Sequence, residues 1–413
     1  MSGTITAIVP TYNRAAYLAE ALAALAGQTR PVAEILVWDD GSVDDTEAVA
    51  RAAARQGPGK HPGQVRYFRS ENGGKSRALN AALREARGDY VWICDDDDIA
   101  LPDAAERLAA PLDADIGLGV SGGSYRRFRT DPATGARIES GPGYWPDLGA
   151  GSILRHLLED IFLFQNATLA RRACYAEVGP FREDLARSID YDMIVRLAAR
   201  FPIAMGEDPV FLQRKHDGAR GPAAARHEAA RSEEVWKAAD RAIFAAFRTA
   251  LPLALYEAMY EGPDAEAVRR AALLQRACVY ARRTDWTAAL EDFFAAAAIR
   301  PEARLSATEY AICRRAMSGK HGCDEALAAP VRRRLATLAR GSAAGADIVR
   351  ALLRGLVWRG RAALEARDVA QLGRLAQMGL ALGPAARARG AASTMPAQAE
   401  RRELPRAAYA ACA

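Results

Sequence analysis

The chain has 413 residues, half of them apolar and 26% charged, with a formal net charge of +5. This length predicts two or three domains with sizeable hydrophobic cores. The charge is uneven, because residues 331–413 hold 15 basic and 5 acidic side chains, which leaves −5 for the first 330 residues. The N-terminal part is therefore not expected to bind nucleic acid, whereas the Arg-rich end has either an anionic partner or a merely solubilising helical face.

The cysteines and the N-terminus predict a cytoplasmic protein. Six cysteines are scattered without a CxxC pair, which favours a reducing compartment. The first residues lack the basic and apolar regions of a secretory signal. No stretch reaches the roughly 18 apolar residues of a membrane span, so any membrane contact is expected to be peripheral, at the inner face.

The first 115 residues alternate short apolar runs with amphipathic stretches. Strands are predicted at Thr4–Val9, Glu34–Trp38, Val65–Phe68 and Tyr90–Cys94, and helices at Ala16–Ala26, Asp45–Arg55, Ser76–Arg87 and Pro102–Ala110. Strands that alternate with helices of this length are typical of a doubly wound α/β sheet. Ligands bind such sheets outside the carboxyl ends of the strands.

The pattern then becomes less regular, and Asp131–Leu148 is predicted to be a surface loop. Residues 225–390 are rich in Ala, Leu and Arg and predict a separate all-α domain after an N-terminal domain of residues 1–219. Within it, Ala271–Pro301 resembles a tetratricopeptide helix pair, and Leu352–Pro384 echoes it weakly. Two imperfect copies favour a helical bundle over a repeat array. A homo-oligomer formed through this bundle is one expectation for its role. Residues 391–413 are expected to be disordered.

Four consecutive carboxylates, Asp95–Asp98, follow the predicted strand Tyr90–Cys94. Like charges this close oppose one another's ionisation unless a cation is bound. Mg²⁺ or Mn²⁺ prefers oxygen ligands and is commonly shared with substrate phosphates. A solvated acidic turn is the alternative for an isolated acidic run.

Two further polar segments lie near predicted strand ends. Asp40 is suited to accept a hydrogen bond from a nucleobase imide or a ribose hydroxyl, beside a tight turn at Gly41. Lys75 and Arg77 follow two glycines at a helix start, where an anion such as a diphosphate is favoured. An Asx turn and an ordinary glycine turn are the alternatives for these segments.

In this order, residues 3–219 resemble the family 2 glycosyltransferases of GT-A fold, which have a Rossmann-like mixed sheet flanked by helices. The matching segments are Ala7–Arg14, Glu34–Thr46, Asn72–Gly74 with Arg77 and Asn80, and Gly88–Asp98. The resemblance implies an inverting transfer of a sugar from a nucleotide diphosphate sugar, most simply a UDP-sugar, to an acceptor hydroxyl. It also implies a divalent metal, Mg²⁺ or Mn²⁺.

The resemblance also implies roles for individual residues on the donor side. Asp40 lies near the base, Asp95 near the ribose, and Asp97 is the principal metal ligand. Asp96 occupies the variable middle of the D-x-D motif, and Asp98 is an extra acid, so the register within the run stays open. The other expected donor-binding residues are Pro10, Thr11, Tyr12, Arg14, Lys75 and Arg77.

On the acceptor side, the resemblance makes Asp190 the general base, although Ile189 stands where the family often has Glu. Asp192 is expected to be a helix acid rather than a catalytic one. His216, in the basic segment that begins at Gln213, is expected to complete the metal shell or bind a phosphate. Trp145, Gln165 and Asn166 are candidates for the acceptor pocket.

Two competing hypotheses remain open. A nucleotidyltransferase also uses an α/β sheet, acids and a divalent ion, but the Gly-rich phosphate loop expected after its first strand is missing here. Alternatively, the protein is a non-catalytic scaffold that binds nucleotide sugars. The acceptor, whether glycan, lipid-linked precursor or protein, is not determined by the sequence.

Overall fold

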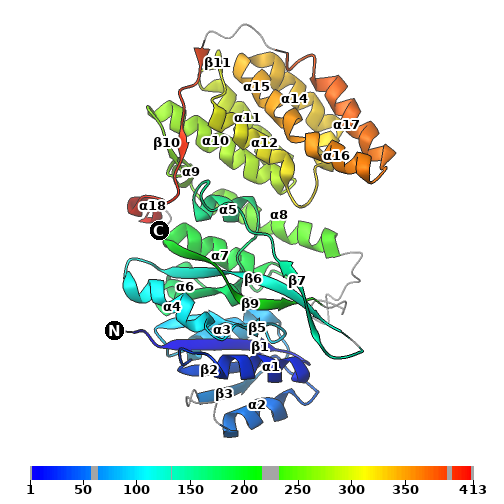
Figure 1. The fold of residues 1–413 in the computed structure, drawn as a ribbon. Coiled ribbons are helices and arrows are strands. Elements are labelled where there is room, and N and C mark those ends of the chain that lie inside the picture. Colours follow the sequence, from blue (N-terminus) through cyan, green and yellow to red (C-terminus); the bar gives the residue numbers. More distant parts are fainter. Residues whose placement is uncertain (1, 57–63, 132, 216–231, 388–392, 411–413) are drawn as a thin grey trace. The chain divides into compact units, whose positions relative to one another are not determined.

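The computed structural model describes all residues except 1, 57–63, 132, 216–231, 388–392 and 411–413 (Figure 1). The chain forms two compact units. Unit 1 comprises Met1–Asp147 and Ile161–Trp236, and unit 2 comprises Leu148–Asp160 and Lys237–Ala413. The predicted boundary at residues 219–225 lies outside the described residues, and the short segment 148–160 belongs to unit 2 although it interrupts unit 1 in the sequence.

Unit 1 is built on one mixed sheet with strand order β3-β2-β1-β4-β8-β6-β9-β5, and β7 pairs with β6. The first four strands are parallel, whereas β8 runs antiparallel to both β4 and β6. This confirms the predicted Rossmann-like mixed sheet. The strands are β1 (Ile5–Thr11), β2 (Glu34–Asp39), β3 (Gln64–Arg69), β4 (Tyr90–Ile93), β5 (Ile99–Ala100), β6 (Val120–Thr130), β7 (Arg137–Pro142), β8 (Thr168–Arg171) and β9 (Ile203–Arg214).

Helices flank this sheet (Figure 1). They are α1 (Ala15–Ala26), α2 (Thr46–Gln56), α3 (Lys75–Glu85), α4 (Ala104–Ala114), α6 (Arg172–Val178) and α7 (Ile189–Arg200), with a 3-10 turn η1 at Gln165–Ala167. Strand β1 is buried along its whole length. Because β2, β1 and β4 are adjacent and parallel, their carboxyl ends open at one edge of the sheet, as the sequence predicts.

The predicted loop Asp131–Leu148 is partly wrong, because Arg137–Pro142 forms strand β7. Its backbone pairs antiparallel with β6, with a register shift between Arg127 and Phe128. Gly141, with φ +91°, adopts a conformation that side-chain-bearing residues rarely reach. The glycines and prolines that suggested a loop are accommodated because β7 is an edge strand.

Unit 2 is mainly helical and also contains two short two-stranded sheets. Its helices are α5 (Ile153–Glu159), α8 (Ser232–Ala250, which begins in unit 1), α9 (Leu253–Glu257), α10 (Ala265–Arg282), α11 (Trp286–Ala298), α12 (Ala307–Arg315), a 3-10 turn η4 (Ala316–Ser318), α13 (Asp324–Leu327), α14 (Ala329–Gly341), α15 (Ala343–Gly355), α16 (Val357–Glu365) and α17 (Val369–Leu382). Helices α10 and α11 form the helix pair predicted for Ala271–Pro301. The Asp285 side chain caps α11 by accepting a hydrogen bond from the Ala288 N–H at 3.0 Å.

The end of the chain packs against other parts of unit 2. The predicted disorder of 391–413 is therefore wrong for residues 393–410. Strand β12 (Ser393–Thr394) pairs with β11 (Ala303–Arg304), strand β13 (Ala399–Glu400) pairs with β10 (Tyr260–Glu261), and helix α18 (Arg406–Ala410) follows. Gln398 is buried and accepts a 2.6 Å hydrogen bond from the Ser306 hydroxyl. Few apolar residues suggested disorder, but hydrogen bonding to distant residues orders this segment.

Among the helices that the structure describes, none is both long and apolar enough to cross a membrane.

Candidate active site

The carboxyl end of β2 carries two buried acids that connect it to neighbouring loops. Asp39 accepts hydrogen bonds from the Tyr67 hydroxyl and the Ser42 N–H, both at 2.7 Å. Asp40 accepts from the backbone N–H groups of Gly73 and Gly74, both at 2.8 Å. The two oxygens of Asp40 therefore hold the loop before α3 in place. The predicted contact with a base would use the remaining lone pairs of these oxygens.

Two glycines shape this part of the site. Gly41 has φ +86°, and a Cβ there would lie 3.0 Å from the backbone nitrogen of Asn72. Gly74, with φ +90°, precedes the first residue of α3. Both positions favour glycine for its positive φ. The turn at Gly74 brings Lys75 to the helix N-terminus, where its ammonium contacts Asp95.

The four consecutive aspartates after β4 alternate in exposure. Side chains of Asp95 and Asp97 are 30% and 17% exposed, whereas that of Asp96 is 7% exposed and Asp98 is buried. Asp95 and Asp97 are thus the two more accessible acids. This is the spacing of a D-x-D motif that begins at Asp95.

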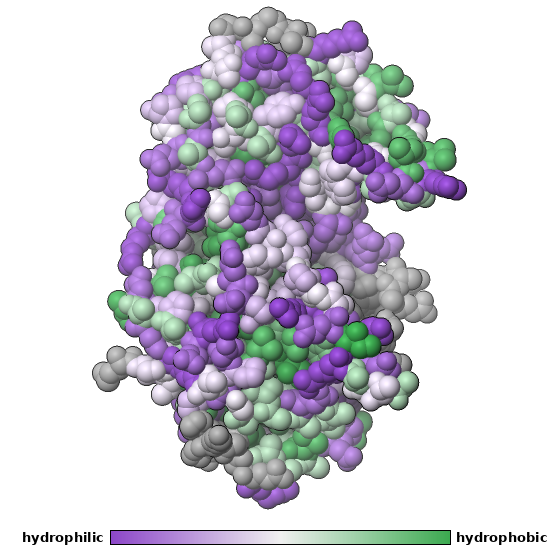
Figure 2. Space-filling model, viewed as in Figure 1, coloured by the Kyte–Doolittle hydropathy of each residue, from purple (hydrophilic) through white to green (hydrophobic). Residues whose placement is uncertain are grey.

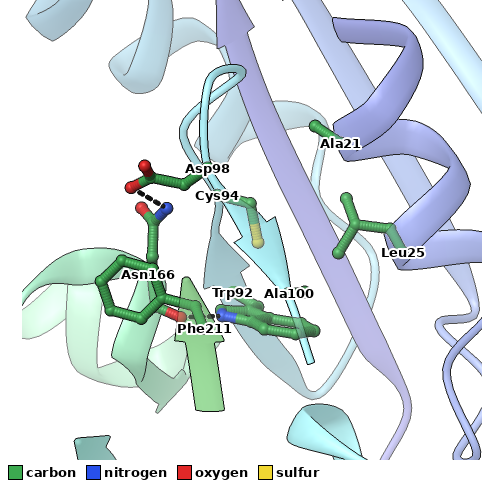
Figure 3. A pocket seen from close by; sticks show the side chains of 8 residues that line it. All are labelled: Ala21, Leu25, Trp92, Cys94, Asp98, Ala100, Asn166 and Phe211. Carbon is green, nitrogen blue, oxygen red and sulfur yellow. Dashed lines mark hydrogen bonds between the residues drawn. The ribbon is translucent and has the colours of Figure 1, made fainter. Parts of the chain in front are cut away.

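Asp98 is held from inside the protein. One of its oxygens accepts a hydrogen bond from the Arg214 N–H at 2.8 Å, and the other accepts from the Asn166 amide at 2.9 Å. Asn166 also accepts from the Asp95 N–H at 3.1 Å, and its carbonyl accepts from the Trp92 indole at 2.8 Å. Trp92, Asp98 and Asn166 are among the residues that line a cavity of about 10 Å³ (Figure 3), about the smallest that holds one water.

Arg14 and Lys75 form ion pairs with the carboxylates of the aspartate turn. The Arg14 guanidinium lies 3.2 Å from Asp96 and also pairs with Asp97, while Lys75 pairs with Asp95. Burial nevertheless raises the pKa of Asp96 to about 7 against the opposing effect of Arg14. Burial and the neighbouring acids Asp97 and Asp95 raise the pKa of Asp98 well above its ordinary value. The pKa values of these two buried acids are thus raised in spite of the nearby cations.

Asp190 lies in the first turn of α7, which follows Ser188 in the left-handed conformation with φ +57°. Burial raises the pKa of Asp190, and the charge of Asp95 adds to the rise while that of Lys75 opposes it. Asp190 is therefore electrostatically coupled to the cluster after β4. Asp192, in contrast, is buried and pairs with Arg196 at 2.7 Å, as expected of a helix acid.

The structure gives positions to the remaining predicted donor residues. Pro10 and Thr11 are buried at the end of β1, and Tyr12 is half-buried just beyond it. Arg77 is exposed on α3, and its side chain lies over Gly73, where a Cβ would be only 2.5 Å from the Arg77 Cδ.

Of the three candidates for the acceptor pocket, Asn166 and Gln165 contact the aspartates. The Gln165 amide donates to Asp95 at 3.3 Å, while the Trp145 ring packs edge-on against Phe162 at 5.3 Å.

Arg214 lies at the end of β9, in the basic segment that contains His216. It is buried, stacks between Tyr17 and Phe128 at 4.8 and 4.6 Å, and donates to Thr130 at 2.6 Å. It also donates to the Asp97 carbonyl at 2.9 Å and so supports the aspartate turn. His216 lies outside the described residues.

The sequence interpretation assigned no role to Tyr67 and did not identify the supporting role of Arg214. Both act on residues far away in the chain. For Tyr67, the available signal was only that it stands on a predicted strand and that the preceding strand is followed by two acids.

The donor set fits a hard divalent cation. Asp95, Asp97 and Asp98 each offer an oxygen within 4.8 Å of the others, and carboxylate oxygens suit Mg²⁺ or Mn²⁺. Because both oxygens of Asp98 already accept hydrogen bonds, Asp95 and Asp97 are the more available ligands.

Comparison with known proteins agrees with this geometry. Residues 6–173 match the model of glycosyl transferase family 2. The chain is 27% identical to chondroitin synthase of Escherichia coli over 194 residues, 47% of this chain and 26% of that protein. It is 30% identical to an uncharacterized glycosyltransferase of Rickettsia conorii over 226 residues, 51% of this chain and 34% of that protein. The matches thus span about a quarter to a third of the length of these relatives.

Among solved structures, S. aureus TarS 1-349 in complex with UDP-GlcNAc is similar in fold, with a TM-score of 0.50 and 18% identity, covering 86% of this chain and 91% of that one. The family match and the shared fold agree with the mixed sheet and its strand-end acids. Residues 6–173 therefore resemble a glycosyl transferase family 2 domain, and the fold of unit 1 is the GT-A fold of glycosyltransferases.

Proposed function

We propose that the protein is a metal-dependent inverting glycosyltransferase that moves a sugar from a nucleotide diphosphate sugar to an acceptor hydroxyl. The observation that carries this proposal is the convergence of Asp40, the Asp95–Asp98 turn, Lys75 and Asp190 at the carboxyl ends of β2 and β4 and the starts of α3 and α7. Asp95, Asp97 and Asp98 offer oxygens within 4.8 Å of one another, which is suited to a divalent cation that also binds a diphosphate.

On the donor side, Asp97 is the principal metal ligand, with Asp95 beside it and directed to the ribose. When bound, Mg²⁺ or Mn²⁺ neutralises charge on the departing diphosphate. Lys75 and Arg14, which pair with these acids, are proposed to contact the phosphates of the donor. Asp40, Pro10, Thr11 and Tyr12 surround the base, and a UDP-sugar is the favoured donor. His216 is proposed to complete the metal shell.

On the acceptor side, Asp190 removes the proton of the attacking hydroxyl. A raised pKa makes its carboxylate a stronger base than an exposed aspartate. Inversion requires attack from the face opposite the leaving diphosphate, so the hydroxyl must reach the anomeric carbon from the side of Asp190. Trp145 and Gln165 are proposed to contact the acceptor, a glycan, a lipid-linked precursor or a protein. For Asn166 the contacts support a different role, that of orienting Asp95 and Asp98.

We also propose that the enzyme acts in the cytoplasm. The described cysteines Cys94, Cys174, Cys278, Cys313 and Cys323 are buried free thiols, which fits a reducing compartment.

The first test is calorimetric titration of the full chain with UDP, GDP, CDP and dTDP, each with and without Mn²⁺. We expect one diphosphate to bind in a Mn²⁺-dependent manner, and UDP to be that one. A screen of sugars on the selected nucleotide then measures turnover. A folded protein that binds none of the four would contradict the proposal and favour the scaffold hypothesis.

A further inference from the structure

Large apolar side chains are exposed on the last helix pair of unit 2. Five of them lie on α16 and α17, with exposed fractions of 47% for Trp358, 67% for Leu364, 77% for Val369 and 79% for Leu380, and 49% for Val357. Figure 2 shows hydrophobic side chains at the surface over these helices. Scattered exposed apolar residues are ordinary, but a group of them on one element indicates a binding surface.

Helix α17 has an apolar row along its exposed side. Val369, Gly373, Ala376 and Leu380 follow one another at spacings of four, three and four residues, and all four are exposed. This spacing places them on one face of the helix. A Cβ at Gly373 would meet nothing within 4 Å, so the row is open. Its inner side is buried through Met378 and Leu382.

The same helix pair is bordered by arginines. Arg354, Arg361 and Arg367 are exposed, and the guanidinium of Arg359 stacks on the Trp358 ring at 4.4 Å. Arg374 is half-exposed, 3.7 Å from Asp324. The acids on the pair, Glu365 and Asp368, are fewer, and Asp368 caps α17. Over residues 331–413 basic residues exceed acidic ones by 15 to 5.

From these features we infer that the α16–α17 surface binds an anionic lipid membrane. Arginines attract an anionic surface, and the apolar residues gain free energy by entering the boundary between headgroups and acyl chains. The charge excess disfavours a second copy of the chain, because two such surfaces repel each other. A nucleic acid or a polyanionic glycan would satisfy the arginines but leave Leu364, Val369 and Leu380 in water.

The test is co-sedimentation of the full chain with vesicles of phosphatidylcholine, with and without phosphatidylglycerol. We expect binding to the phosphatidylglycerol vesicles, weakened by added salt. A blue shift of tryptophan emission, absent in Trp358→Phe, locates the contact. The double variant Leu364→Glu/Leu380→Glu should lose at least about tenfold in binding, because each change removes an apolar side chain that would enter the bilayer and adds repulsion from the anionic lipid.

Ile116→Glu is the matched control, since Ile116 of unit 1 is 86% exposed, and it should bind vesicles like the unchanged chain. Nucleotide binding of the double variant should also be unchanged. Failure of the membrane inference can therefore be distinguished from failure of the glycosyltransferase proposal. Equal binding to both vesicle types, binding to neither, or unaltered binding by the double variant would overturn the inference. A concentration-dependent dimer in sedimentation velocity that Leu380→Glu abolishes would instead establish a second copy as the occupant.

Discussion

Acidic side chains gather in both units, but their counter-charges differ. In unit 1, Arg14 and Lys75 pair with the aspartates after β4, yet the pKa of Asp96 rises to about 7. In unit 2, Glu159 lies among Arg155, Arg282 and Arg315. Its burial favours a higher pKa, but the three arginines outweigh it and lower the pKa to about 2.

This difference distinguishes a cation-binding site from a charge cluster with a structural role. In unit 2, the charge of Glu159 is neutralised within the protein, so it stabilises the fold. In unit 1, burial and the neighbouring aspartates raise the pKa values of Asp96 and Asp98, and a bound cation relieves such repulsion. Perturbed carboxylates in a partly open crevice are typical of functional sites. Four changes test this contrast.

Asp190→Asn should reduce turnover by roughly 10²–10⁴-fold, the usual contribution of a general base, and leave donor binding unchanged. Steady-state kinetics and calorimetry with the selected nucleotide measure the two effects. Asp184→Asn is the matched control, since Asp184 is 65% exposed and pairs with Arg182 alone among the ion pairs found. Full turnover by Asp190→Asn would show that another group acts as the base.

Asp97→Ala should weaken Mn²⁺-dependent nucleotide binding by at least about tenfold, because it removes a proposed metal ligand. Calorimetry at several Mn²⁺ concentrations measures the loss. Asp103→Ala, at the surface beside Arg107, should bind normally. If Asp97→Ala binds nucleotide as the unchanged chain does, the metal lies elsewhere in the Asp95–Asp98 turn.

Glu159→Gln should destabilise unit 2 by about 3–5 kcal/mol, because it leaves buried arginines without their counter-charge. Scanning calorimetry measures the shift, and Glu257→Gln, at a more exposed pair with Arg269, should change little.

The pH dependence of Glu159 has a definite sign. Because folding lowers its pKa from 4.5 to about 2, its contribution to stability is present above pH 4.5 and is lost as the pH falls toward 2. The Glu159→Gln variant should lack this part of the acid sensitivity. An equally steep loss in the variant would assign it to other carboxylates.

Arg14→Gln should tighten binding of Mn²⁺ alone by a few-fold, because Arg14 competes with the metal for Asp97. Electron spin resonance of free Mn²⁺ measures this without turnover. Arg51→Gln, 57% exposed on α2, controls for a change in net charge. Weaker metal binding by Arg14→Gln would mean that Arg14 organises the acids rather than competing for them.

The sequence was sufficient for the parts of unit 1 that depend on local patterns. Apolar runs and helical periodicity located β1 to β4 and α1 to α4, and adjacent parallel strands necessarily bring Asp40 and Asp95 to one edge. The acidic run itself indicated a cation. These features are encoded within short stretches of chain, so they are readable without knowledge of the fold.

Contacts between distant residues were decided only by the tertiary structure. Asn166 and Arg214 fix Asp98 from far along the chain, and thereby leave Asp95 and Asp97 as the accessible pair. Likewise, α5 joins unit 2 through the ion pair of Glu159 and Arg315 at 2.9 Å. The hydrogen bond from Ser306 to Gln398 orders the segment 393–410, which has few large apolar residues. Composition and periodicity report local preference, whereas burial and long-range hydrogen bonding depend on which segments the fold brings together.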